Sequence, residues 1–134
     1  MTLALDTSAL LARYLEGPER ALVLSAMADD HDWCASALAL TEALLLAGRV
    51  TDDAWLADDL RRALYEDWQR VTVVPLDEAC LDRAAELGRN HPVGTVAALH
   101  LAAALRLPKP LTYLTFDTHQ IPVALALGFD VAST

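Results

Sequence analysis

Short apolar runs alternate along the chain with longer segments that begin and end in polar residues. The runs are typical of buried strands, and the segments between them are typical of helices. The predicted strands are Met1–Leu5, Trp33–Ala35, Val71–Pro75, Leu111–Leu114 and Phe129–Val131. This alternation predicts the α/β class: a three-layer sandwich with a short central parallel sheet and helices on both faces.

The predicted helices begin at capping residues and end at glycine or proline. One predicted helix begins at Pro18, and the others follow Ser8, Ser36, Thr51, Asp77, Gly94 and Asp117. The helix after Thr51 is amphipathic, and Gly88 is expected to close the next one. The helices after Ser36 and Gly94 are apolar almost all round, so both are expected to pack close to the sheet.

Length and composition place limits on the function. A chain of 134 residues that is 54% hydrophobic fits a single globular domain over 1–134. No apolar run has the roughly 18 residues of a membrane span. Cys34 and Cys80 form no metal-binding or redox motif and are expected to be core residues of a reduced, cytoplasmic protein. The net charge of −9 argues against broad electrostatic binding of nucleic acid, although a local basic rim is compatible with it.

Three acidic residues stand out because of where they occur. Asp6 and Asp117 each follow an apolar strand, and right-handed crossovers place the first and fourth strands side by side. Both acids should therefore lie at the carboxyl edge of the sheet, where ligands of α/β proteins collect. Glu42 interrupts an apolar helix, where an unpaired carboxylate is costly. The alternatives are a helix N-cap for Asp6 and a water-facing helix rim for Glu42.

Carboxylates that converge from separate elements repel one another unless a cation lies between them. Their oxygen atoms favour Mg²⁺ or Mn²⁺, and such ions support the hydrolysis of phosphodiesters. We expect Asp6, Glu42 and Asp117 to lie within about one metal coordination sphere. Mutual repulsion should raise the pKa of at least one of them when no metal is bound.

Four segments stand out in sequence order: Leu5–Leu10, Thr41–Leu44, Ala97–Ala104 and Leu114–Asp117. Together they resemble the PIN domain family, and in particular its VapC-type toxins. The resemblance spans almost the whole chain. It implies a magnesium-dependent endoribonuclease toxin of a type II toxin–antitoxin system, which would dimerise and be held inactive by an antitoxin whose basic residue enters the acidic pocket.

One position departs from the family pattern. The third segment usually begins with Asp, whereas this chain has Ala97. Few carboxylates suffice for a magnesium ion that keeps several waters, so the substitution weakens binding without necessarily abolishing it. Catalysis is more sensitive to the position of the metal. Ala97 is either a natural loss or an inactivating substitution, and the sequence does not separate the two.

Further residues are candidates for supporting roles. Thr7, Ser8 and Thr115 are expected either to orient the carboxylates or to act only as turn and cap residues. Arg89, which precedes the third of these segments, is a candidate for contact with a substrate phosphate. His100 lies on an apolar helix, where a packed histidine with one hydrogen bond is expected rather than a metal ligand.

Two functions from different classes therefore compete. The first is a metal-dependent ribonuclease toxin with Asp6, Glu42 and Asp117 at its centre. The second is a catalytically impaired PIN domain that binds RNA or an antitoxin. A phosphate-accepting receiver domain is a poor third, because its lysine has no counterpart after the fourth strand: the only lysine, Lys109, precedes it.

Overall fold

The computed structural model describes residues 1–134, and its five strands form one parallel sheet. The order across the sheet is β3-β2-β1-β4-β5, so the first strand is central. The strand bounds are β1 (Thr2–Leu5), β2 (Asp32–Ser36), β3 (Thr72–Val74), β4 (Leu111–Leu114) and β5 (Asp130–Ala132). β1 pairs directly with β4, with Leu5 opposite Leu114. The predicted neighbourhood of the first and fourth strands is therefore confirmed.

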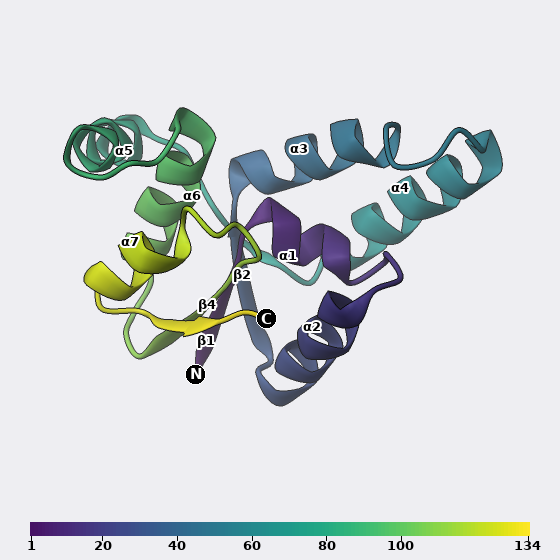
Figure 1. The fold of residues 1–134 in the computed structure, drawn as a ribbon, viewed down its shortest axis with the longest axis horizontal. Helices are drawn as coiled ribbons and strands as arrows, with labels where there is room; N and C mark the ends of the chain where they lie inside the picture. Colours follow the sequence, from purple (N-terminus) through teal and green to yellow (C-terminus); the bar gives the residue numbers. More distant parts are fainter.

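The helices form two layers, with α1 to α4 on one side of the sheet and α5 to α7 on the other (Figure 1). Their bounds are α1 (Thr7–Ala12), α2 (Pro18–Asp29), α3 (Ala37–Ala47), α4 (Ala54–Trp68), α5 (Glu78–Asn90), α6 (Thr95–Leu105) and α7 (Ile121–Ala126). The structure thus confirms the predicted α/β sandwich.

The side chains of β1 alternate between two hydrophobic cores. Leu3 and Leu5 pack with residues of α1 to α4, whereas Ala4 packs with residues of α5 to α7. This alternation is the normal geometry of a strand, whose successive side chains point to opposite faces. The apolar N-terminal run is therefore buried on both sides, as expected for the central strand of a parallel sheet.

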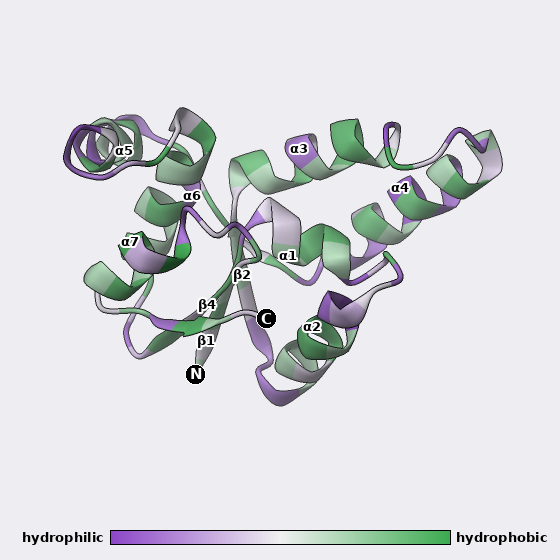
Figure 2. Ribbon diagram, viewed as in Figure 1, coloured by the Kyte–Doolittle hydropathy of each residue, from purple (hydrophilic) through white to green (hydrophobic).

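The two most apolar helices pack in different ways. α6 lies against β2, whereas α3 packs mainly against α1 and α4 rather than directly on the sheet. Both helices are apolar along most of their length in Figure 2. Ala39, Ala43 and Ala47 are fully buried along one side of α3, and these small side chains allow close approach. The α3–α4 pair extends away from the sheet (Figure 1).

Several helix ends differ from the predicted ones. Asp53, rather than Thr51, caps α4 by accepting hydrogen bonds from Trp55 and Leu56 N–H. α5 continues past Gly88 to Asn90, and α7 begins only at Ile121. Residues 118–120 instead form a turn after β4. None of the helices is long and apolar enough to span a membrane.

Candidate functional site

Asp6 occupies the point where β1 ends and α1 begins. Its side chain accepts a hydrogen bond from Ala9 N–H at 2.9 Å, so it caps α1. The residue is only 2% exposed. The N-cap alternative is therefore correct for Asp6, and it is compatible with a place at the sheet edge.

Two hydroxyl groups join Asp6 to the end of β4. Ser8 Oγ donates to Asp6 Oδ1 at 2.7 Å, and Thr115 Oγ1 donates to Oδ2 at 2.6 Å. Each hydroxyl also accepts a backbone hydrogen bond, from Phe116 N–H to Ser8 and from Asp117 N–H to Thr115. The two strand ends are thus connected through the carboxylate of Asp6.

Glu42 lies on the second turn of α3 and faces α6. Its Oε1 accepts a hydrogen bond from Thr7 Oγ1 and lies 2.8 Å from His100 Nε2. The other ring nitrogen of His100 lies 3.0 Å from Ser36 Oγ. When Ser36 donates to Nδ1, the ring proton is on Nε2 and points to Glu42. The prediction of a singly bonded histidine was wrong, because His100 contacts Ser36, Thr7 and Glu42.

Gln120 was not predicted from the sequence as a site residue. Its Nε2 donates to Asp6 Oδ2 at 3.2 Å and to Asp117 Oδ2 at 3.1 Å. Its Oε1 accepts a hydrogen bond from the Tyr113 hydroxyl at 2.6 Å. The side-chain amide therefore bridges the two carboxylates that follow β1 and β4.

Asp117 completes this edge of the sheet. Its Oδ1 accepts from His119 N–H at 2.9 Å and lies 3.3 Å from the His119 ring. The His119 side chain is 81% exposed, in agreement with a surface position. Asp117 itself is partly exposed, unlike Asp6, so its carboxylate is accessible to solvent and ligands.

The three carboxylates line one cleft of about 320 Å³. Its other lining residues are Thr7, Ser8, Leu46, Val96, Ala97, His100 and Gln120. Neither lysine nor arginine lines the cleft, and its one imidazole, His100, contacts only one of the three acids, Glu42. A phosphate group is therefore repelled unless a cation enters with it.

The donor types fit a hard divalent cation, because Asp6, Glu42 and Asp117 all supply carboxylate oxygens. Their spacing is wider than expected: no group of three His, Cys, Asp or Glu side chains is arranged to hold a metal ion. The cause is visible in the contacts. Gln120 separates Asp6 from Asp117, while Thr7 and His100 hold Glu42 against α6.

Burial and hydrogen bonding shift the pKa values of the three acids in different directions. Burial raises the pKa of Asp6, against the lowering effect of its hydrogen bonds. The His100 hydrogen bond lowers the pKa of Glu42. Burial acts to raise the pKa of Asp117, but hydrogen bonds from His119 and Gln120 bring it below its usual value. One carboxylate thus has the expected raised pKa, although burial rather than mutual repulsion is the cause.

A family model for the PIN domain matches residues 3–132. The chain belongs to the PIN domain family. This match covers nearly every residue of the fold and includes the strand ends that carry Asp6 and Asp117. No curated protein resembles the sequence closely enough to count as a match.

Solved structures with the same PIN fold come from several bacterial complexes. FitAcB from Neisseria gonorrhoeae aligns with a TM-score of 0.72 at 18% identity, covering 97% of this chain and 96% of that one. VapBC2 from Rickettsia felis bound to a promoter DNA fragment aligns with a TM-score of 0.71 at 13% identity, covering 100% of this chain and 99% of that one. A toxin–antitoxin complex from Klebsiella pneumoniae aligns with a TM-score of 0.69 at 16% identity, covering 90% of each chain.

Ala97 lies in the first turn of α6 and lines the acidic cleft of this PIN domain. It is only partly buried, so it faces the cleft rather than the hydrophobic core. Gly94, which precedes the helix, makes no side-chain cap. The position where the family usually has Asp is therefore open to the cleft and close to a helix N-terminus.

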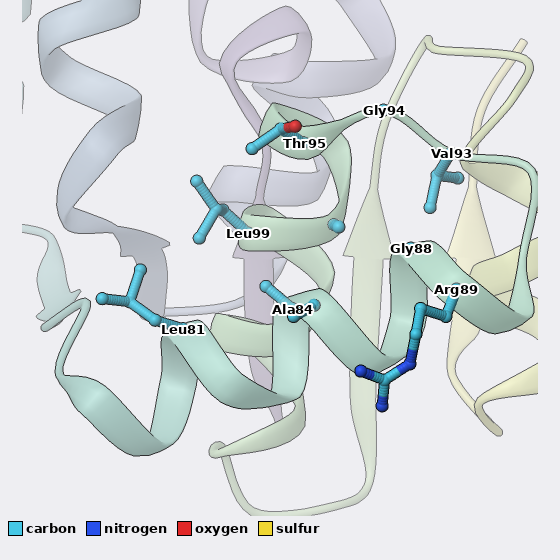
Figure 3. A pocket seen from close by; sticks show the side chains of 10 residues that line it. Leu81, Ala84, Gly88, Arg89, Val93, Gly94, Thr95 and Leu99 are labelled. Atoms are coloured by element: carbon cyan, nitrogen blue, oxygen red, sulfur yellow. The ribbon is translucent and has the colours of Figure 1, made fainter.

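Arg89 does not line the acidic cleft. It lies with α5 and α6 residues along a neighbouring groove of about 490 Å³, where Figure 3 shows it with Thr95 and Leu99. Val96 and Ala97 face the acidic cleft, whereas Thr95, Ala98 and Leu99 face this groove. The first turn of α6 thus separates Arg89 from the carboxylates, and its predicted phosphate contact has no support from this placement.

Ser36, His100 and Glu42 form a hydrogen-bonded row that is similar in composition to a hydrolase triad. Ser36, however, is 3% exposed. The void beside it has a volume of about 10 Å³, too small for a substrate. A nucleophilic role for Ser36 is therefore excluded, and the row serves to hold Glu42.

Proposed function

We propose that this PIN domain is a VapC-type toxin: a magnesium- or manganese-dependent endoribonuclease of a type II toxin–antitoxin system, acting in the cytoplasm. The observation that supports it best is the gathering of Asp6, Glu42 and Asp117 in one cleft that no lysine or arginine lines. Such a cleft attracts cations strongly, and its oxygen ligands favour Mg²⁺ or Mn²⁺.

The carboxylates of the cleft and the residues that contact them have separate tasks in this proposal. Asp6, Glu42 and Asp117 hold the cation. A divalent cation held there would supply activation of water and neutralisation of the phosphate charge for phosphodiester hydrolysis. Thr115 and Ser8 fix the orientation of Asp6, while Thr7 and His100 keep Glu42 ionised and aimed at the cleft.

Ala97 favours a second candidate, a catalytically impaired PIN domain that binds RNA or an antitoxin. The two oxygens of Asp6 already accept hydrogen bonds from four donors, and Gln120 occupies the space toward Asp117. A cation must compete with these contacts without the help of a carboxylate at position 97. An antitoxin that brings its own basic side chain needs no cation in the cleft.

The proposed partners follow from the same cleft. RNA enters only with a cation, whereas a basic antitoxin side chain supplies positive charge itself and blocks the site. Two of the structures with this fold are VapBC2 bound to a promoter DNA fragment and a toxin–antitoxin complex. We therefore propose an antitoxin as the protein partner. The homodimer is proposed from the resemblance to VapC-type toxins alone.

RNA cleavage with matched variants tests the proposal. The purified chain is incubated with structured RNA in Mg²⁺, in Mn²⁺ and in EDTA, and the new RNA ends are sequenced. The ribonuclease is supported if cleavage occurs at defined sites and requires the metal. Cleavage should be lost in Glu42→Gln and Asp117→Asn and should persist in the exposed control Glu66→Gln. If neither the purified chain nor Ala97→Asp cleaves RNA, but RNA or antitoxin binding is retained, the second candidate is supported.

A further inference from the structure

Gln120 is a buried polar residue whose side chain is committed to the acidic cleft. It is 4% exposed and stands at the N-cap of α7, yet it makes no side-chain capping hydrogen bond. Its amide oxygen and nitrogen instead contact Tyr113, Asp6 and Asp117. Helix capping therefore does not explain the presence of an amide at this position.

Tyr113 determines which end of the amide faces the acids. Its hydroxyl, which is buried, donates to Gln120 Oε1 at 2.6 Å. The Nε2 group then points to the carboxylates and has two protons, one for each of them. An amide flipped the other way would place its oxygen against two carboxylates. The orientation is thus determined by three polar neighbours on different elements.

The amide nitrogen contacts the inner oxygens of the cleft. The distances of 3.2 Å to Asp6 Oδ2 and 3.1 Å to Asp117 Oδ2 are about 1 Å longer than a Mg²⁺–oxygen bond of ~2.0–2.1 Å. A cation held between these two carboxylates would use their facing oxygens, which the amide nitrogen already contacts. The amide and the cation therefore compete for one pair of ligands.

We propose that Gln120 is a positioning residue that bridges Asp6 and Asp117 in the metal-free protein and lowers the affinity of the cleft for a divalent cation. This inference rests on the proposed function, because it concerns the same metal ligands. In the metal-free state the amide stabilises two neighbouring carboxylates through hydrogen bonds to charged groups. Binding of the cation has to break or rearrange these hydrogen bonds.

Three variants separate this role from simple packing. Gln120→Met keeps the length of the side chain and removes both hydrogen bonds to the acids. Gln120→Glu replaces the competing donor with a further oxygen ligand. Tyr113→Phe removes the hydroxyl that orients the amide and leaves Gln120 in place. Gln69→Met is the matched control, because Gln69 is exposed and its amide makes only one weak contact, with Tyr65 O at 3.5 Å.

Titration calorimetry with MnCl₂ on the purified full chain provides the measurement, together with melting curves without metal. The dissociation constant of Mn²⁺ should fall about tenfold in Gln120→Met, further in Gln120→Glu and less in Tyr113→Phe. The metal-free melting temperature of Gln120→Met and Gln120→Glu should fall. A purely structural role would lower the melting temperature without tightening Mn²⁺ binding.

The outcomes distinguish this inference from the proposed function. If the unmodified chain binds Mn²⁺ and cleaves RNA, but Gln120→Met and Tyr113→Phe bind Mn²⁺ equally or more weakly, the inference alone is wrong. Tighter binding in either of these variants, but not in Gln69→Met, supports it. If no variant binds Mn²⁺ and none cleaves RNA, both the inference and the metal-dependent nuclease are rejected.

Discussion

His100 Nε2 lies 2.8 Å from Glu42 Oε1 and joins α6 to α3, two helices on opposite sides of the sheet. The contact links residues 58 positions apart in the chain. Thr7 Oγ1 lies 3.0 Å from the same ring nitrogen and donates to the same carboxylate oxygen. The contact therefore anchors one acidic residue of the cleft from both helix layers.

This contact makes stability depend on pH through Glu42. Its folded pKa is lowered, chiefly by the His100 hydrogen bond, so the carboxylate stabilises the fold above its ordinary pKa of 4.5. That stabilisation is lost as the pH falls below 4.5 through the folded pKa. Glu42→Gln should reduce the unfolding free energy by about 1–2 kcal/mol at pH 7, because a charge-assisted hydrogen bond is lost.

Urea unfolding at a series of pH values measures this difference. The gap between the unmodified chain and Glu42→Gln should shrink between pH 5 and pH 3, whereas the exposed control Glu66→Gln should stay close to the unmodified chain at every pH. A gap that is independent of pH would show that the carboxylate charge does not contribute.

A second prediction concerns the hydroxyl between the two strand ends. Thr115→Val keeps the shape of the side chain but removes the donor to Asp6 and the acceptor of Asp117 N–H. Because Thr115 is fully buried, the loss should cost about 2 kcal/mol. Thr112→Val on the same strand is the control, since its hydroxyl contacts only Met1 Sδ at 3.5 Å. Equal unfolding free energies for the two variants in urea would contradict the anchoring role.

The sheet and the edge position of two acids were predictable from local sequence. Apolar runs that end in Asp6 and Asp117 define two strands, and the handedness of the crossovers makes them neighbours. The α/β class and the pairing of β1 with β4 require only this pattern, whereas the rest of the strand order was not predicted. Ser8 and Thr115 were recognised as candidates because hydroxyls beside strand ends commonly bind nearby carboxylates or backbone groups.

The bridging role of Gln120 was not predictable from local sequence. Gln120 follows Asp117 in a turn and carries no pattern that distinguishes it from a surface residue. Its role depends on Tyr113 and Asp6, which approach it only in the folded sheet. The three contacts of His100 were missed for the same reason. The expected start of α7 at Thr118 was wrong because residues 118–120 form a separate turn.

A third prediction concerns the most buried acid. Burial raises the pKa of Asp6, so proton binding favours the folded state, and its contribution to stability falls as the pH rises through the folded pKa. Carbon-detected NMR of the side-chain carboxyl should give Asp6 a higher pKa than Glu42 and Asp117, whose pKa values are lowered. Saturating Mg²⁺ should lower the pKa of Asp6 if it is a ligand. A lower pKa for Asp6 than for Asp117 in the metal-free chain would contradict the burial effect.

The last prediction concerns Ala97, where two interpretations give opposite results. If the cleft is a metal site, Ala97→Asp adds a fourth carboxylate beside the cation. The first turn of α6 favours a negative charge there, because its backbone N–H groups face the N-terminal end and Gly94 provides no side-chain cap. Metal affinity and RNA cleavage should increase, and the chain should become harder to express without its antitoxin. If Ala97 is only a packing residue, an added carboxylate should cost stability and bring no gain.

Thermal unfolding with and without magnesium distinguishes the two interpretations. A ligand that binds only the folded state raises its stability by mass action, so a tighter site gives a larger shift. Ala97→Asp should gain more from Mg²⁺ than the unmodified chain, by about 1–2 kcal/mol when the affinity rises roughly tenfold or more. Ala97→Asn is the control, because the Asn side chain has nearly the shape of Asp without its charge. This variant should show no such gain. If Ala97→Asp melts at a lower temperature and does not respond to magnesium, the acidic cleft is not a metal-dependent nuclease site.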